Sequence, residues 1–253
     1  MKNIRLAAAA LSAALLVSLA APLAAQTLHV VTESTPNSFL QNGRVTGPAT
    51  EMVEQTLRRA GLTDYRIDLY PWARAQDLAL REPFVLIYLI ARTPERENRY
   101  RWLGEIKRSR YYLFGLADRA DLHITQLDDA RAWTIGVVRD DVRQLALQRR
   151  GFTRLAVSAQ PAENFRKLLN RQVDLLVLSE GEAGKMCGET RPACTGLTRL
   201  LLLEDVAAEL YMAFSITTPE EMAARTRAAF DSLRADGTLQ RTMGLDTPPA
   251  PRR

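Results

Sequence analysis

The stretch Phe84-Val85-Leu86-Ile87-Tyr88-Leu89-Ile90-Ala91-Arg92-Thr93-Pro94-Glu95-Arg96-Glu97 is where an apolar run gives way to charge. Residues 84–89 predict a strand buried on both faces, as in a parallel sheet. Thr93 suits the N-cap of a short helical turn and Pro94 its first residue, where a missing N–H costs nothing. Arg92 and Arg96 therefore stand where a buried strand ends, the place where open α/β sheets bind small ligands. A helix start decorated with solvated charges is the alternative that this stretch alone leaves open.

The patterns before this stretch alternate between strand and helix. A helix opens at Pro48, carries Met52, Val53, Leu57 and Ala60 on one face, and stops at Gly61. Strands are predicted at 27–32 and 65–69, and a second helix at 73–80 precedes the strand at 84–89. This β-α-β-α-β order implies a parallel sheet with right-handed crossovers.

The same order returns later in the chain with shorter elements. Strands are predicted at 133–138, 155–157 and 173–178, with helices at 141–150 and 161–170 between them. Two extended apolar segments, 109–116 and 209–215, bracket this unit, as two lobes joined by a two-stranded hinge would require. A capping box at Thr218 is then expected to open a long helix, and a short helix runs to Met243.

The first 25 residues are typical of a secretory signal peptide. Lys2 and Arg5 give a basic start, residues 6–21 are rich in Ala, Leu and Val, and residues 22–25 form a small-residue exit. We therefore expect export to the periplasm, with cleavage after Ala25. A retained membrane anchor is the weaker alternative, because the apolar run is short of about 20 residues. The tail at 247–253 is expected to be disordered.

Export favours a disulfide between the two cysteines, Cys187 and Cys194. Half a zinc site is the competing interpretation, but only His29 and His123 could complete it, and both are far away in sequence. Removing the signal peptide lowers the formal net charge from +5 to +3, a surplus too small to indicate nucleic-acid binding.

Arg92-Thr93-Pro94-Glu95-Arg96-Glu97, followed by Trp102-Leu103-Gly104, resembles the family-3 group of ABC-transporter substrate-binding proteins, the periplasmic receptors of the amino-acid type. The likeness covers nearly the whole mature chain. It implies a type II periplasmic-binding fold, α/β in class, with lobe 1 at 26–112, lobe 2 at 113–210 and a return to lobe 1 at 211–246. It also implies a small-molecule ligand and a membrane permease as partners. We further expect a monomer without a cofactor or a metal.

Relatives of this kind bind the ligand's α-carboxylate with the arginine of a Thr-x-x-Arg segment, a position that Arg96 fits. A guanidinium presents paired donors to a planar carboxylate and keeps its charge when buried. A salt bridge from Arg96 to Glu95, Glu97 or Asp68 is the competing interpretation. The other expected ligand-binding residues stand at strand ends: Glu33, Trp72, Tyr88 and Arg92 in lobe 1, and Arg139, Asp140 and Glu180 in lobe 2.

Lobe 2 departs from these relatives in the stretch Gly136-Val137-Val138-Arg139-Asp140-Asp141. An arginine and two acids stand where the relatives have the small and hydroxylated residues of a Gly-x-x-x-Gly-[Ser/Thr]-Thr turn, which puts a simple α-amino acid ligand in doubt. Asp140 or Asp141 is alternatively the N-cap of the next helix. Trp72 either stacks on a ligand or plugs its own loop. Glu180 corresponds loosely to the acid that receives the α-amino group, or is a solvated turn residue.

Motifs of several enzyme classes are missing from the sequence. No Gly-x-Ser-x-Gly elbow, His-x-x-x-His pair or Gly-rich phosphate loop occurs, which disfavours an enzyme. The expected function is capture of an amino acid, a small peptide or an organic acid for an ABC transporter. A periplasmic dehydratase of cyclic dienyl acids on the same fold and a stand-alone sensory receptor are the alternatives.

The mature protein is expected to begin near Gln26 and to contain no free thiol. A bridge between Cys187 and Cys194 closes a small loop, so chain entropy predicts about 2.5 kcal/mol of stabilisation. Thiol titration of the denatured protein after periplasmic expression measures this. Two reactive thiols per chain would contradict the disulfide.

Overall fold

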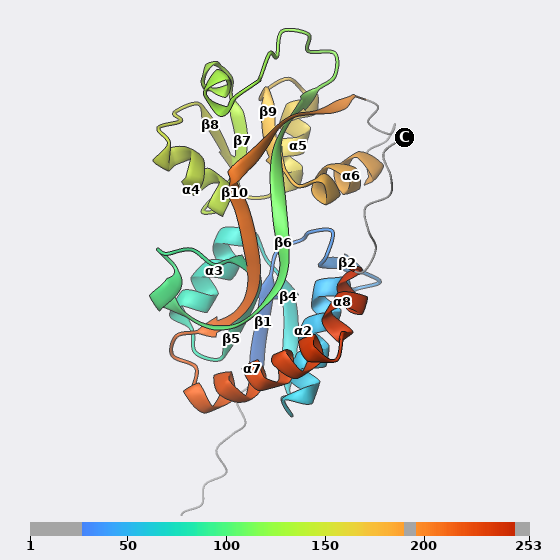
Figure 1. Ribbon diagram of the computed structural model, residues 1–253, viewed down its shortest axis with the longest axis vertical. Helices are drawn as coiled ribbons and strands as arrows, with labels where there is room; N and C mark the ends of the chain where they lie inside the picture. Colours follow the sequence, from blue (N-terminus) through green and yellow to red (C-terminus); the bar gives the residue numbers. More distant parts are fainter. Residues whose placement is uncertain (1–26, 190–195, 246–253) are drawn as a thin grey trace, which may run out of the picture.

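The computed structural model describes residues 27–189 and 196–245, which form two α/β lobes stacked along the long axis of the molecule (Figure 1). The signal peptide, the tail and Cys194 lie outside these residues, so what the sequence predicts for them stays a prediction. None of the helices in the described ranges is long and apolar enough to cross a membrane.

Lobe 1 is a parallel β-sheet with helices on both faces. It contains β1 (Leu28–Thr32), the hairpin β2 (Phe39–Gln41) and β3 (Arg44–Thr46), α2 (Pro48–Arg59), β4 (Tyr65–Leu69), α3 (Trp72–Arg81), β5 (Val85–Ala91), α7 (Glu220–Ala235) and α8 (Thr238–Met243). Strand β1 pairs in parallel with β4 on one side and with β5 on the other. Helices α2, α7 and α8 pack on one face of this sheet, and α3 packs on the opposite face.

Lobe 2 repeats this arrangement on a smaller scale. It contains the 3₁₀ helix η2 (Leu127–Ala132), β7 (Ile135–Val138), α4 (Val142–Arg149), β8 (Leu155–Ser158), α5 (Pro161–Leu169), β9 (Leu175–Leu178) and α6 (Glu180–Glu189). Strand β7 pairs in parallel with β8 and β9. Helix α4 belongs to the core on one face, and α5 and α6 belong to the core on the other. The two predicted β-α-β-α-β units are confirmed.

Two long antiparallel strands, β6 (Tyr100–Leu116) and β10 (Leu197–Ser215), run through both lobes (green and orange in Figure 1). They join the two parallel sheets into one, in the order β4-β1-β5-β10-β6-β9-β7-β8. Their pairing is irregular where they enter lobe 2: Leu203 faces Tyr111, and the next pair joins Ala208 to Ser109. The two-lobe fold with a two-stranded connection is confirmed, whereas the predicted lobe boundaries and a closing motion about them stay predictions.

Some local predictions are wrong. Thr93 does not cap a helix, because the turn after β5 leads only into a 3₁₀ helix, η1 (Glu97–Arg99). Thr218 does not cap α7, because its hydroxyl is hydrogen-bonded to that of Ser215 at 2.8 Å and Pro219 takes the N-cap position. The segments 109–116 and 209–215 are the C-terminal ends of longer strands. Charged residues in the rest of these strands interrupt the apolar pattern from which a strand is predicted. Hairpin β2–β3 and helix α6 are additions to the predicted elements.

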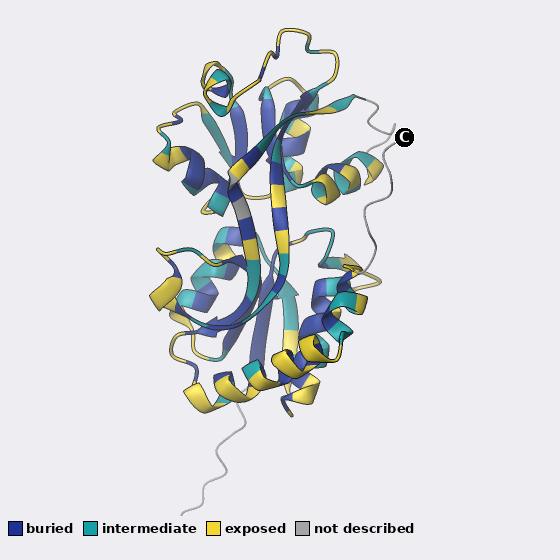
Figure 2. Cartoon of the chain, in the orientation of Figure 1, coloured by how far each residue is buried: buried dark blue, intermediate teal, exposed yellow. Residues whose placement is uncertain are grey.

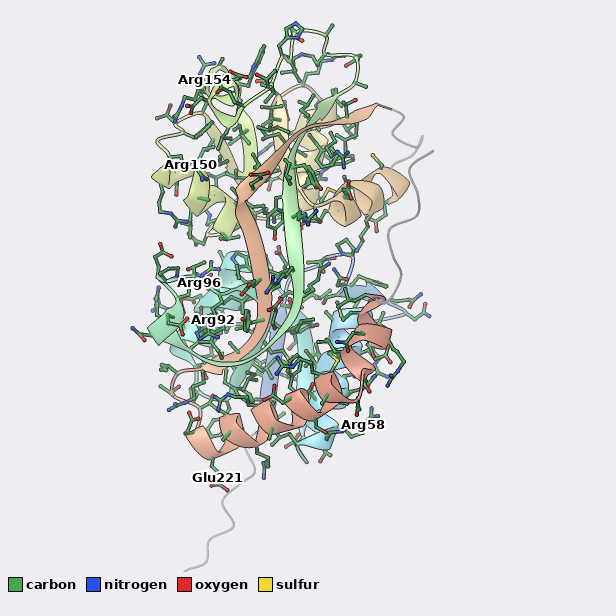
Figure 3. The ribbon with its side chains drawn as sticks, viewed as in Figure 1. Arg58, Arg92, Arg96, Arg150, Arg154 and Glu221 are labelled. Atoms are coloured by element: carbon green, nitrogen blue, oxygen red, sulfur yellow. The ribbon has the colours of Figure 1, made fainter. Side chains whose placement is uncertain are left out.

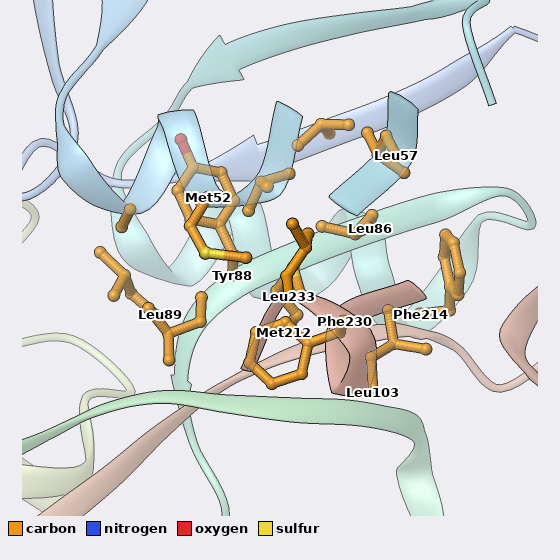
Figure 4. Packing of buried hydrophobic residues seen from close by; sticks show 14 of the residues in the cluster. Met52, Leu57, Leu86, Tyr88, Leu89, Leu103, Met212, Phe214, Phe230 and Leu233 are labelled. Carbon is orange, nitrogen blue, oxygen red and sulfur yellow. The ribbon is translucent and has the colours of Figure 1, made fainter. Parts of the chain in front are cut away.

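The core of lobe 1 lies between the central strands and helices α2 and α7 (Figures 2 and 4). The predicted apolar face of α2 is buried, and its last member, Ala60, is the C-cap. From the other side, Phe230 of α7 packs directly onto Gly104 of β6. A β-carbon at Gly104 would lie 2.1 Å from the Phe230 ring, and that ring is fully buried. The glycine of the Trp102-Leu103-Gly104 motif is therefore a packing requirement.

We expect Gly104→Ala to destabilise the protein by about 1–3 kcal/mol, because the added methyl overpacks the site. Phe230→Ala alone should cost about 3–5 kcal/mol through the cavity that it leaves. In the Phe230→Ala background, Gly104→Ala should cost much less, because the methyl then has space. Urea unfolding of the four proteins measures this coupling, and an equal cost of Gly104→Ala in both backgrounds would contradict the packing account.

Candidate functional site

The carboxyl ends of the lobe 1 strands face lobe 2 across a cavity of about 50 Å³. Loops after β1, β5 and β7, the first turns of α3, α4 and α6, and the crossing strands all contribute to its walls. The lining residues are Glu33, Thr35, Pro36, Asn37, Trp72, Leu89, Ala91, Arg96, Lys107, Ser109, Tyr111, Asp141, Val142, Arg143, Ser179, Glu182 and Leu210.

Hydrogen bonds between the lobes close this cavity. The carbonyl of Asp140 in lobe 2 accepts from Trp72 Nε1 at 3.1 Å and from Arg96 Nη2 at 3.0 Å, both in lobe 1. On the other side, Lys185 Nζ of lobe 2 donates to the carbonyl of Thr35 at 3.0 Å. The structure is thus a closed arrangement of the two lobes, and the residues between them are withdrawn from water.

Arg96 is a buried cation without an acidic partner. Only 5% of its surface is exposed, and its hydrogen bonds go to three neutral oxygens: Gln76 Oε1 at 2.8 Å, the Asp140 carbonyl and the Ala91 carbonyl at 3.2 Å. In residues 27–189 and 196–245, no carboxylate lies within 4.0 Å of its guanidinium nitrogens. Burial lowers the pKa of Arg96, but a guanidinium stays charged in proteins. Two of its five N–H groups are left without an oxygen partner in these ranges.

The alternative predicted for Arg96, a salt bridge to Glu95, Glu97 or Asp68, is not formed. Glu97 instead forms a bidentate ion pair with Arg92, whose Nε and Nη2 donate to the two carboxylate oxygens at 2.8 and 2.5 Å. Asp68 is hydrogen-bonded to His29 at 2.9 Å. Arg92 itself lies over the rings of Trp102 and Tyr211, away from the cavity. Both arginines belong to lobe 1 (Figure 3).

Two residues near the cavity have strained backbone conformations. Leu89 has a φ of 61° and forms a bulge in β5, because Tyr211 of β10 pairs with Ile90 and Met212 pairs with Tyr88. Asp140 has a φ of 60° after β7, which turns its carbonyl toward Arg96. Such conformations of non-glycine residues cost about 1–3 kcal/mol and concentrate at functional sites.

Lobe 2 contributes a buried ion network centred on Arg143. Asp141 is the N-cap of α4, as one alternative predicted, and accepts the Arg143 amide N–H at 2.7 Å. The Arg143 guanidinium binds the same carboxylate twice, at 2.7 and 3.1 Å, and binds Glu182 at 3.1 Å. Burial opposes ionisation of Asp141, but Arg143 holds the pKa of this carboxyl below its usual value. The network carries two acids for one base, so it presents net negative charge to the cavity.

Glu33 faces this network from lobe 1. It follows β1, only 9% of its surface is exposed, and its Oε2 has no hydrogen-bond partner in the described part of the chain. Burial, together with nearby Asp141, raises the pKa of Glu33 to about 8, and Arg143 only partly opposes this. The carboxyl of Glu33 is therefore mostly protonated at pH 7 in the closed arrangement.

Lys107 of β6 adds a third cation to the cavity wall, after Arg96 and Arg143. No hydrogen bond or ion pair engages its ammonium group within residues 27–189 and 196–245. Burial lowers the pKa of Lys107, and the charge of Glu182 counters this effect. The cavity wall thus combines Arg96 and Lys107 with the acids Glu33, Asp141 and Glu182.

The structure brings three of the predicted binding residues into contact with the cavity: Arg96, Trp72 and Glu33. Asp140 contributes its carbonyl. Tyr88 is fully buried behind the cavity, where Ser38 and Thr50 hydrogen-bond its hydroxyl at 2.9 and 2.8 Å and so fix the start of α2. Arg139 is exposed, and Glu180 is exposed and paired with Arg199, so neither lines the cavity.

Four charged cavity residues are absent from the predicted ligand-binding set: Lys107, Asp141, Arg143 and Glu182. Lys107 lies in the half of β6 that the strand prediction omits. Glu182 lies two residues after Glu180 in α6, a helix that the sequence analysis does not predict. Residues two apart in a helix are about 200° apart around its axis, so Glu180 and Glu182 point in nearly opposite directions. The spacing of Asp141 and Arg143 at a helix start was a usable signal for a local ion pair. No group of acids, histidines or cysteines among the described residues is arranged to hold a metal ion.

Solved structures share this architecture. A histidine kinase sensor domain with similarity to periplasmic binding proteins matches with a TM-score of 0.78 at 20% identity, over 87% of this chain and 95% of that chain. An amino acid ABC transporter substrate-binding protein from Streptococcus pneumoniae, bound to L-arginine, matches with a TM-score of 0.72 at 14% identity, over 86% and 92%. The ancestral amino acid-binding protein AncCDT-1, a precursor of cyclohexadienyl dehydratase, matches with a TM-score of 0.69 at 17% identity, over 87% and 94%.

The chain therefore has the two-lobe fold of the periplasmic binding proteins. At these identities the likeness establishes the fold and leaves the ligand open. A scan against protein families finds no match, and a search of curated proteins finds none either.

The protonated state of Glu33 should make stability depend on pH. The folded protein holds a proton that an exposed glutamate releases above its ordinary pKa of 4.5, and it keeps this proton up to about pH 8. The stability linked to this proton is complete below pH 4.5 and is lost as the pH rises through about 8.

Glu33→Gln, a neutral isostere, should remove that loss. The melting temperature of the wild type should fall relative to the variant between about pH 5 and about pH 9, and the two should converge near about pH 4. Glu221→Gln, on the exposed face of α7, is the control and should follow the wild type. Parallel melting curves for wild type and Glu33→Gln over this range would contradict the buried, protonated Glu33.

Proposed function

We propose that this protein is a periplasmic substrate-binding component of an ABC transporter, of the family-3 type, that closes its lobes over a small carboxylate-bearing solute. Amino acids, small peptides and organic acids are the candidate ligands. The observation that carries the proposal is Arg96, a buried guanidinium at the inter-lobe cavity with no acidic partner in the described ranges. An unpaired buried charge is costly, and a ligand carboxylate on its unused N–H groups would offset that cost.

The rest of the cavity complements such a ligand. The Trp72 ring, whose centroid lies 5.7 Å from the Arg96 guanidinium carbon, forms one wall of the anion site. Lys107 adds positive charge, and Glu33 and Glu182 offer oxygens to a cationic or hydrogen-bond-donating group of the ligand. A zwitterion with its carboxylate toward Arg96 and its ammonium toward the acids therefore fits the charges of the cavity.

The fold supports the transport role, since an amino acid ABC transporter substrate-binding protein shares it. Under this proposal the protein works in the periplasm, as a monomer, and presents the closed lobes to a membrane permease. A stand-alone sensory receptor is the second candidate, favoured by the likeness to a histidine kinase sensor domain. Genes for a permease and an ATPase beside this gene would favour transport, and their absence would favour sensing.

We also propose that the protein is not an enzyme. The observation that favours the opposite is Glu33, because a buried, protonated carboxyl could serve as the general acid of a dehydratase. Incubation with cyclic dienyl acids, followed by mass spectrometry of the products, separates the two functions. Catalytic accumulation of a dehydrated product would establish the enzyme.

Arg96→Ala should weaken ligand binding without unfolding the protein. Truncating one partner of a buried, hydrogen-bonded charge pair costs about 2–5 kcal/mol, or about 30-fold to several thousand-fold in affinity. Arg96→Lys should recover only part of this loss, because an ammonium group cannot bind both carboxylate oxygens side by side. Calorimetric titration of the ligand that co-purifies with the protein, identified by mass spectrometry, gives the affinities.

Arg92→Ala is the matched control, because it also removes a guanidinium from the loop after β5. The Arg92 guanidinium pairs with Glu97 and lies outside the cavity. Its affinity should stay within about twofold of wild type. Melting temperatures check that each variant folds. If Arg96→Ala folds and binds within about threefold of wild type, a loss under about 0.7 kcal/mol, Arg96 does not bind the ligand.

A further inference from the structure

A second, larger cavity adjoins the first. Its volume is about 240 Å³, against about 50 Å³ for the cavity at Arg96. Four residues, Glu33, Thr35, Pro36 and Glu182, line both spaces, so the two are neighbours across a shared wall. We call the larger space the side chamber. It lies between the loops after β1 and β4 of lobe 1 and, in lobe 2, the first turn of α5 and one side of α6.

The lining of the side chamber is mostly apolar. Three prolines, Pro36, Pro71 and Pro161, form rigid parts of its walls, and Leu69 and Tyr70 add apolar and aromatic surface. Among its polar groups, Lys185 donates to the Thr35 carbonyl at 3.0 Å, and the Lys185 ammonium lies 3.9 Å from Glu189. Apolar walls with a few placed polar groups are typical of ligand pockets.

The shared wall contains one of the buried side-chain atoms that lack a hydrogen-bond partner among the described residues. Glu33 Oε2 is buried without a hydrogen bond in the described residues, and Glu33 lines both cavities. A ligand that extends from Arg96 past Glu33 would satisfy this atom on its way into the side chamber. If the ligand filled only the cavity at Arg96, the larger side chamber would hold water, and this water would contact the apolar surfaces of proline, leucine and tyrosine residues.

We propose that the ligand is an elongated carboxylate with a bulky apolar or aromatic group, whose carboxylate lies at Arg96 and whose apolar group fills the side chamber. This inference rests on the proposed binding function and adds the ligand class. It disfavours compact polar amino acids as the preferred ligands. Glu33, between the two spaces, then accepts a hydrogen bond from a donor in the middle of the ligand.

Titration calorimetry with a graded set of probes tests this. The probes are L-alanine, L-glutamine, L-phenylalanine, L-tryptophan and the dipeptide L-alanyl-L-phenylalanine, added to protein that has been unfolded, dialysed and refolded to remove bound ligand. Burying an aromatic side chain contributes enough that the best aromatic probe should bind at least about tenfold tighter than L-alanine or L-glutamine.

Ala162→Trp places an indole at the side-chamber wall from an exposed position in the first turn of α5. It should weaken the best aromatic probe by more than about tenfold and leave L-alanine unchanged. Ala224→Trp, at an exposed position on α7, is the matched control and should change neither. Melting temperatures confirm that both variants fold.

The outcomes separate the inference from the function on which it rests. If compact probes bind as tightly as aromatic ones, depend on Arg96 and ignore Ala162→Trp, the elongated ligand is wrong and the binding function stands. If neither a probe nor the ligand that co-purifies with the protein binds in a way that depends on Arg96, the proposed function is contradicted and the inference fails with it.

Discussion

The structure depends on how one buried positive charge is accommodated. Arg96 lies at the end of β5 with three neutral oxygens around it and no carboxylate within the described residues to neutralise it. Each lobe supplies part of this environment: Gln76 and the Trp72 ring come from lobe 1, and the Asp140 carbonyl comes from lobe 2. An ion pair within the protein would have been more stabilising than these contacts. Under the proposed function, the carboxylate of the ligand is the counter-ion that neutralises the Arg96 guanidinium.

Under the proposed function, the same geometry couples ligand capture to the arrangement of the lobes. Strands β6 and β10 each run from one lobe into the other, so the lobes share one sheet. The lobes meet at the carboxyl ends of their parallel strands. Contacts from Asp140 and Lys185 then bring the acids of lobe 2 over the arginine of lobe 1. In this closed arrangement, burial above all, and then the nearby charge of Asp141, raise the pKa of Glu33. Closure therefore sets the charge balance that a ligand meets.

Much of this was readable from the sequence because it follows from local pattern. The apolar run 84–89 is buried along β5, the periodic residues of α2 face the core, and Arg96 at the strand end lies at the cavity. The remainder depends on contacts between distant segments. Glu182, not Glu180, reaches the cavity because α6 begins directly after β9 and its first residue turns outward to Arg199. Lys107 was hidden because charged residues interrupt the pattern of β6, and the pairing with β10 that makes it a strand is non-local. The family resemblance favours Arg96 over Arg92, but the local pattern does not separate them, since only the fold shows which one pairs with Glu97.

A crystal structure of the protein with the ligand that co-purifies with it is the most direct test. The account predicts a ligand carboxylate within about 3 Å of the Arg96 guanidinium, at the hydrogen-bond distances of a charged pair. A ligand that occupies the space between the lobes while Arg96 keeps only Gln76, Ala91 and Asp140 as partners would contradict it.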